Sequence, residues 1–161
     1  MSAGSYFLRV TDIEISVVPY ASAIAQRLVA ATLADQGARY GGSGDDTPVE
    51  ANEFDPPDGA FLVAYLGEEP VGCGGWRSHG EFAELKRIYT AAHARRRGIG
   101  RAVLAAVERS AREHGRKRMI LECGDRQPEA IAMYEAAGYE RIEDFGFYRW
   151  SPEVRSYGRD L

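Results

Sequence analysis

The chain has 161 residues, of which 45% are hydrophobic and 27% charged, and its formal net charge is −4. This length predicts one domain spanning residues 1–161, large enough to bury a core without disulfides or metals. The net negative charge does not favour nucleic-acid binding, and no apolar run approaches the length of a membrane span. The first residues lack the pattern of a secretion signal, and Cys73 and Cys123 suit free thiols in a reducing compartment, so we expect a cytoplasmic protein.

The first sixty residues predict a strand, a helix and a long loop. Apolar and polar residues alternate over 13–18, which indicates a strand, and apolar positions recur at helical spacing over 21–39. Glycines end this helix and begin a loop over 41–59, which has room for one helical turn. The loop contains no Lys or Arg but six acids, which are Asp45, Asp46, Glu50, Glu53, Asp55 and Asp58. Such a block of one charge sign is most often a solvated face.

Three β-prone segments follow, at 60–66, 71–77 and 82–90. Because the turns between them are short, we expect an antiparallel meander. The middle segment contains Gly72-Cys73-Gly74-Gly75, which lacks the last glycine of a dinucleotide-binding fingerprint. We therefore interpret these glycines as positions kept free of side chains by packing.

The rest of the chain alternates helices and strands. The predicted elements are a helix over 98–114, a strand over 118–123, a helix over 128–137 and strands over 139–142 and 154–159. The strand after the first of these helices should run parallel to the strand before it, as in a helix crossover. Asp125 or Gln127 can cap the second helix, with Pro128 in its first turn. The element order predicts an α/β or α+β domain, with a mixed sheet and helices on its faces.

The most specific motif lies between the third meander strand and the following helix. Its residues are Arg95, Arg96, Arg97, Gly98, Ile99, Gly100 and Arg101. The first N–H groups of a helix lack partners and carry the positive end of the helix dipole, so they form an anion site. Glycines let a phosphate approach the backbone, and arginines add positive charge. The alternative is a solvated basic run at an ordinary helix start. The pattern is neither a P-loop nor a dinucleotide fingerprint.

Read as R-x-x-G-x-G with Arg95 at its start, this loop resembles the coenzyme A pyrophosphate loop of the Gcn5-related N-acetyltransferase (GNAT) superfamily. Residues 83–90 resemble the strand before that loop, and residues 127–139 resemble the motif N-x-x-A-x-x-x-Y-x-x-x-G-F. The three motifs occur in the family's order, and the resemblance covers about 61–161. It implies a mixed, mostly antiparallel central sheet with flanking helices. It also implies acetyl transfer from acetyl-CoA to an amine by direct attack in a ternary complex.

The resemblance further implies which residues hold the coenzyme. In the family, the strand before the loop splays from its neighbour, and its backbone pairs with the pantetheine arm and the thioester carbonyl. By position these residues are Ile88, Tyr89 and Thr90. Gln127 and Ala130 complete the set, although Gln127 stands where many members have Asn. No metal is implied, and the three histidines of the chain are scattered without a ligand pattern.

Tyr134 matches the family's general acid. The ordinary pKa of a thiol is about 8.5 and that of a tyrosine about 10, so a phenol beside the departing sulfur can donate a proton without being ionised itself. The alternative is a packed tyrosine on an amphipathic helix.

Glu84 is the candidate general base. It lies six residues before Thr90, and at that spacing a glutamate is the base in histone-type members of the family. An alkylammonium must lose a proton before it attacks, so a nearby carboxylate suits this role. The alternative is a strand carboxylate paired with Lys86 or Arg87. Glu122, on the next strand, is a second candidate.

The acceptor is predicted least well. In the family, the segment after the first helix and a segment near the C-terminus wall the acceptor site. Here the first holds the six acids, and the second holds Phe145, Phe147, Tyr148 and Trp150. Acids beside aromatic rings suit a cationic, partly apolar amine. Small molecules and proteins both remain open as acceptors, and dimers are common in the family.

Two rival functions remain open. The first is a non-catalytic acyl-CoA sensor that keeps the loop without turnover. The second is a nucleic-acid or phosphoprotein binding module that uses Arg95, Arg96 and Arg97.

Overall fold

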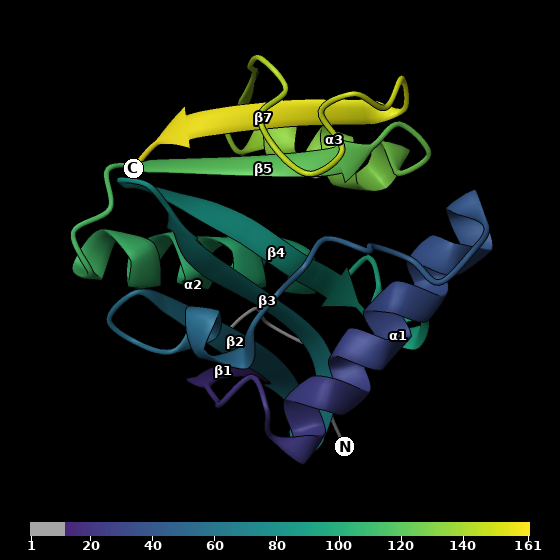
Figure 1. Cartoon of the computed structure of the whole chain (residues 1–161). Helices are drawn as coiled ribbons and strands as arrows, with labels where there is room; N and C mark the ends of the chain where they lie inside the picture. Colours follow the sequence, from purple (N-terminus) through teal and green to yellow (C-terminus); the bar gives the residue numbers. More distant parts are fainter. Residues whose placement is uncertain (1–11) are drawn as a thin grey trace, which may run out of the picture.

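A computed structural model describes residues 12–161 (Figure 1). The strands are β1 Ile13–Val17, β2 Gly59–Leu66, β3 Glu69–His79, β4 Phe82–Thr90, β5 Arg118–Gly124, β6 Glu140–Arg141 and β7 Val154–Asp160. The α-helices are α1 Ala23–Tyr40, α2 Ile99–Glu113 and α3 Pro128–Ala136, and the 3-10 turns are η2 Ala51–Phe54 and η3 Ala92–Ala94. The predicted order of elements is confirmed, but the strand predicted over 139–142 is reduced to the two residues of β6.

The strands form one mixed sheet in the order β1-β2-β3-β4-β5-β7-β6. β2, β3 and β4 are antiparallel neighbours, which confirms the predicted meander, and β1 adds a further antiparallel strand beside β2. β4 and β5 are parallel and joined by the α2 crossover, whereas β5, β7 and β6 are again antiparallel. The expected mixed, mostly antiparallel sheet with flanking helices is therefore confirmed. In the described part of the chain, no helix is long and apolar enough to cross a membrane.

The two faces of the sheet carry separate cores, with α1 on one face and α2 and α3 on the other (Figure 1). β2 illustrates how period-two alternation divides them. Phe61 and Val63 pack on the α1 side, whereas Ala60, Leu62 and Ala64 pack on the α2 side. Since β2 is buried on both faces, it appears in the sequence as a continuous apolar run.

The glycines of β3 admit the neighbouring elements. A Cβ at Gly74 would lie 2.9 Å from the Val103 side chain of α2, and one at Gly75 would lie 2.9 Å from the ring of Phe61. Both distances are shorter than ordinary carbon contacts. The interpretation that packing keeps these positions free of side chains is confirmed.

Candidate active site

β4 and β5 separate soon after they meet. The paired residues are Ala83 with Met119 and Glu84 with Ile120, and the rest of β4 leaves its neighbour. Figure 1 shows the two strands diverging toward their arrowheads, with the C-terminal half of α1 across the opening. The splay that the family resemblance implied is therefore confirmed. Backbone groups that face the opening must bond to water or to a ligand.

A β-bulge marks the place where β4 turns away. The β3–β4 register shifts between Cys73 and Gly75, and Arg87 has a left-handed backbone with φ of 60°. Such bulges bend a strand and are common beside active sites. The three residues after the bulge, Ile88 to Thr90, are half-buried and line up along the opening. The stretch predicted to hold pantetheine is thus the stretch that the bulge redirects.

The arginine-rich loop leads directly into α2. Gly98 is the N-cap residue, with φ of 78° in the left-handed region, and it has no side chain to bond the first N–H groups of the helix. Arg96, Arg97 and Arg101 are exposed, and none has an ion-pair partner within residues 12–161. A Cβ at Gly100 would lie 3.2 Å from the Met133 sulfur. The loop therefore combines free N–H groups, free cations and a close backbone approach.

Arg95 differs from these arginines. Its Nε donates to the carbonyl of Thr90 at 3.0 Å, and its terminal nitrogen contacts Asp35 of α1 at 3.3 Å. Arg95 therefore links the end of β4 to α1, whereas its three neighbours point to solvent.

Tyr134 is buried on α3. Its side chain is 3% exposed and packs against the rings of Tyr139 and Tyr157. Burial raises its pKa, and the nearby Cys123 thiol adds to the rise. The phenol therefore keeps its proton at neutral pH, which both the acid role and the packing alternative allow. Of the third motif, Gln127 lies at the N-cap of α3 and accepts from the Gly124 N–H through its side chain, so it does not cap the helix as predicted.

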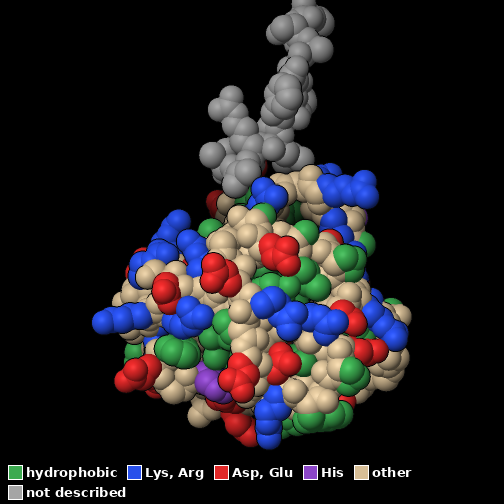
Figure 2. Space-filling model, turned by 90° about the horizontal axis from the view of Figure 1, so that it is seen from above, with side chains coloured by type: hydrophobic (Ala, Val, Ile, Leu, Met, Phe, Trp, Pro, Cys, Tyr) green, Lys and Arg blue, Asp and Glu red, His purple; other side chains and the backbone are tan. Residues whose placement is uncertain are grey.

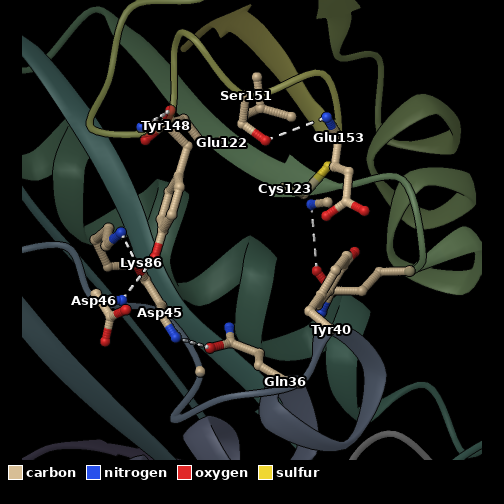
Figure 3. A pocket seen from close by; sticks show the side chains of 15 residues that line it. Gln36, Tyr40, Asp45, Asp46, Lys86, Glu122, Cys123, Tyr148, Ser151 and Glu153 are labelled. Carbon is tan, nitrogen blue, oxygen red and sulfur yellow. Dashed lines mark hydrogen bonds and ion pairs between the residues drawn. The ribbon is translucent and has the colours of Figure 1, made fainter.

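A pocket of about 290 Å³ opens where α1, β4 and β5 meet (Figure 3). Its walls come from the end of α1, loop 41–46, the strands β4 and β5, and the segment before β7. The lining residues are Gln36, Tyr40, Gly41, Gly44, Asp45, Asp46, Lys86, Glu122, Cys123, Gly124, Gln127, Tyr148, Ser151, Glu153 and Val154. The sequence did not reveal Gln36 and Tyr40. Their spacing of four residues, which puts them on one face of α1 just before a glycine stop, was the available signal.

The two candidate bases have different environments. Glu84 has a side chain 3% exposed, accepts from Arg77 at 2.8 Å and does not line the pocket. Its partner is thus Arg77, not the predicted Lys86 or Arg87. Glu122 lines the pocket, and its Oε2 accepts from the N–H of Tyr148 at 3.1 Å. Its Oε1 is buried without a hydrogen-bond partner, and burial raises the pKa of this carboxyl.

Most acids of loop 41–59 do not face the pocket. Asp45 bonds to Lys86 at 2.7 Å and to Arg87 at 2.5 Å. Burial alone would raise its pKa, but these two charges outweigh burial and hold it well below the usual range. Glu50 and Glu53 cap η2. Of the six acids, only Asp46 joins Asp45 in lining the pocket, and it is exposed without an ion-pair partner in the described chain.

The aromatic wall is also narrower than expected. Tyr148 lines the pocket, and its hydroxyl accepts from the N–H of Asp46 at 2.7 Å. Phe145 packs instead on His79, Phe147 packs on the outer edge of Tyr148, and Trp150 is 75% exposed. One of the four aromatic residues therefore forms the wall, and Tyr40 of α1 faces it across the pocket (Figure 3).

Comparison with known proteins agrees with this geometry. The family model described as the acetyltransferase (GNAT) family matches residues 26–139. The chain belongs to the GNAT acetyltransferase family. It is accordingly an acyltransferase of the acetyl-CoA-dependent kind.

Among its relatives, the IAA acetyltransferase of Azospirillum brasilense is 35% identical over 117 residues, which cover 68% of this chain and 76% of that protein. A solved structure from Klebsiella pneumoniae subsp. pneumoniae, of a protein assigned as an acyl-CoA N-acyltransferase, has a TM-score of 0.76 and 28% identity, covering 92% and 97% of the two chains. A GNAT acetyltransferase of Elizabethkingia anophelis with acetyl-CoA bound has a TM-score of 0.66 and 18% identity, covering 93% and 99%.

Proposed function

We propose that this enzyme transfers the acetyl group of acetyl-CoA to a primary amine by direct attack in a ternary complex. The observation that carries this proposal is the opening between β4 and β5, which has an anion-binding helix start on one side and the pocket on the other. A thioester in the opening would be reached by an amine from the pocket, so no covalent enzyme intermediate is needed. Proximity of the two substrates then supplies a large part of the rate enhancement.

The coenzyme would be held mainly by backbone. The diphosphate fits the first N–H groups of α2 from Gly98 to Arg101, with Arg96 and Arg97 adding charge. The pantetheine amides fit the open edge of Ile88, Tyr89 and Thr90. Donors fixed there would stabilise the oxyanion that develops at the thioester carbonyl. Gln127 lines the adjoining pocket, and Ala130 of α3 packs at the edge of the core.

Tyr134 would protonate the departing thiolate. Its raised pKa keeps the phenol protonated, and it shares its core with Cys123, which lines the pocket. Tyr134→Phe should lower kcat about 10–1,000-fold, the scale of general-acid catalysis, with little change in acetyl-CoA affinity. Tyr157→Phe is the matched control because it removes a hydroxyl from an adjacent ring in the same cluster. Full activity of Tyr134→Phe would make Tyr134 a packing residue.

We assign the general base to Glu122 in place of Glu84. Glu122 lines the pocket with an unpartnered oxygen and a raised pKa, whereas Glu84 is already paired with Arg77. Glu122→Gln should lower kcat/KM most near neutral pH and recover in part at high pH, where more acceptor amine is neutral. Glu84→Gln should lower stability and leave the pH profile unchanged. If instead Glu84→Gln changes the pH profile in this way and Glu122→Gln does not, Glu84 is the general base.

The acceptor we propose is a cationic amine. Glu122 and Asp46 are the carboxylates of the pocket without an ion-pair partner in the described chain, and the rings of Tyr40 and Tyr148 can contact a cation or its alkyl chain. The acceptor can be a small molecule or a protein side chain. We further propose a reducing, cytoplasmic setting, in which Cys73 and Cys123 remain free thiols.

A turnover screen tests the activity directly. Thiol release from acetyl-CoA is measured against a broad library of amines, with a reaction that lacks the enzyme as the blank. Acetylated amine formed in step with free thiol is the expected result. Coenzyme binding without turnover across the library would favour the non-catalytic acyl-CoA sensor. Figure 2 shows basic and acidic side chains interspersed on the face seen from above, an arrangement that gives little support to a nucleic-acid binding module.

A further inference from the structure

The C-terminal half of α1 is held differently from its N-terminal half. The buried residues of the helix are Ala25, Leu28, Val29 and Thr32, and all belong to its first part. They pack into the core on that face of the sheet. Beyond Thr32 the helix has no buried residue and crosses the opening between β4 and β5 (Figure 1). Leu33 packs partly buried at the edge of this core, and beyond it polar contacts hold the half-helix in place.

On the β4 side, Asp35 makes the contact. Its Oδ1 lies 3.3 Å from a terminal nitrogen of Arg95. The Nε of Arg95 donates to the Thr90 carbonyl at 3.0 Å, and its guanidinium lies 6.0 Å from the centre of the Tyr89 ring. A single guanidinium thus joins α1 to the last residue of β4.

On the other side, Arg39 and Tyr40 make the contacts. Arg39 pairs with Asp35 at 3.2 Å and with Glu129 of α3. It also donates to the carbonyl of Arg126 at 3.0 Å, and the N–H of Arg126 donates to the Tyr40 hydroxyl at 2.8 Å. The charges therefore alternate without interruption from Arg95 through Asp35 and Arg39 to Glu129, from one lip of the opening to the other.

We propose that this chain of four charges is a strap that roofs the pantetheine channel, and that Arg95 acts through Asp35 as a positioning residue instead of binding the diphosphate. The inference rests on the proposed function, because it assumes that the pantetheine arm lies in the opening. Arg96, Arg97 and Arg101 have no ion-pair partner in the described chain and remain free for the diphosphate, whereas Arg95 already contacts Thr90 and Asp35.

The strap also connects the two substrates. Gln36 and Tyr40 belong to the same half of α1 and line the acceptor pocket. A coenzyme that fits beneath the strap would fix this half-helix and, with it, one wall of the pocket. Asp35 is therefore expected to affect the KM of the amine as well as coenzyme binding.

A shortened donor distinguishes the two roles of Arg95. S-acetylpantetheine lacks the diphosphate. A residue that binds the diphosphate therefore affects the binding of coenzyme A and not that of S-acetylpantetheine. Binding of both molecules is followed by NMR titration of the full chain. Arg95→Ala and Asp35→Asn should each weaken the binding of both molecules by the same factor, about two- to five-fold, as expected for a partly exposed ion pair. Arg97→Ala, the matched control, should weaken the binding of coenzyme A alone.

Two results would overturn the strap. One is that Arg95→Ala weakens the binding of coenzyme A but not that of S-acetylpantetheine. The other is that Asp35→Asn leaves the binding of both molecules unchanged. Each variant is first checked for a native thermal transition, and Asp35→Asn removes one charge without altering volume, so it should fold. Failure of the wild-type protein to bind coenzyme A at all would instead refute the proposed function.

Discussion

Two loops of this protein each carry one sign of charge, and they use it in opposite ways. In loop 41–59 the acids are largely engaged within the protein: Asp45 holds Lys86 and Arg87, and Glu53 caps η2 and pairs with Arg77. In loop 95–101 three of four arginines have no ion-pair partner in the part of the chain that the structure describes. A run of like charge therefore indicates a ligand site only where the fold leaves the charges unpaired.

The backbone separates the loops in the same way. The basic loop ends at a helix whose first N–H groups have no side-chain cap, and its N-cap residue Gly98 has a left-handed φ. The acidic loop is pinned over β4 by a carboxylate that is 14% exposed. The first loop is arranged for an outside partner and the second for closing the fold. The following predictions test this contrast, from the largest expected effect to the smallest.

Gly100→Glu should abolish coenzyme A binding. A side chain there would start 3.2 Å from the Met133 sulfur and would place a negative charge where the diphosphate is expected. Calorimetric titration measures the affinity, and circular dichroism checks the fold. Unchanged affinity in a folded variant would remove the basic loop from coenzyme binding.

Asp45→Asn should destabilise the fold by about 3–5 kcal/mol, because it leaves two buried cations without their partner. Chemical denaturation measures the loss. The pH dependence has a defined sign: the pKa of Asp45 is lowered in the folded state, so its contribution is complete above the ordinary aspartate pKa of about 3.9. In the wild type it should be lost as the pH falls from there toward the folded-state value. A variant as stable as wild type at neutral pH would contradict the structural role.

Asp46→Asn should have a moderate effect on the acceptor alone. Asp46 lines the pocket with no ion-pair partner in the described residues, so its removal should raise KM for cationic amines about three- to ten-fold, as expected for a partly screened charge, and flatten its salt dependence. Steady-state kinetics at two salt concentrations measure both. An equal rise in KM for neutral amines would mean that the pocket recognises the shape of the amine and not its charge.

Asp55→Asn and Asp58→Asn should change least. Both side chains are exposed, and the Asp58 ion pair with Arg116 spans 3.7 Å at the surface. We expect stability within about 0.5 kcal/mol of wild type and an unaltered KM. A KM that rises as much as in Asp46→Asn would show that the acidic loop acts as a whole, and the contrast between the loops would fail.

The sequence predicted elements better than pairings. The sequence predicted the meander of β2, β3 and β4 and the parallel crossover to β5, because apolar alternation and turn residues are local signals. The partner of Glu84 was missed, because cross-strand register decides that Arg77 lies opposite it. The contact of Asp35 with Arg95 joins residues sixty positions apart, and no local pattern reveals it. Tyr40 had a local signal in its spacing from Gln36, but its place in the pocket depends on where α1 ends in space.

The opening between β4 and β5 also has a consequence for solubility. Where the two strands part, each presents a row of backbone groups that a foreign strand could pair with, as at any sheet edge. Here the two edges lie inside the molecule, and the half-helix of α1 with loop 41–46 covers them. The cover over this opening thus also keeps a pair of internal strand edges from pairing with other chains.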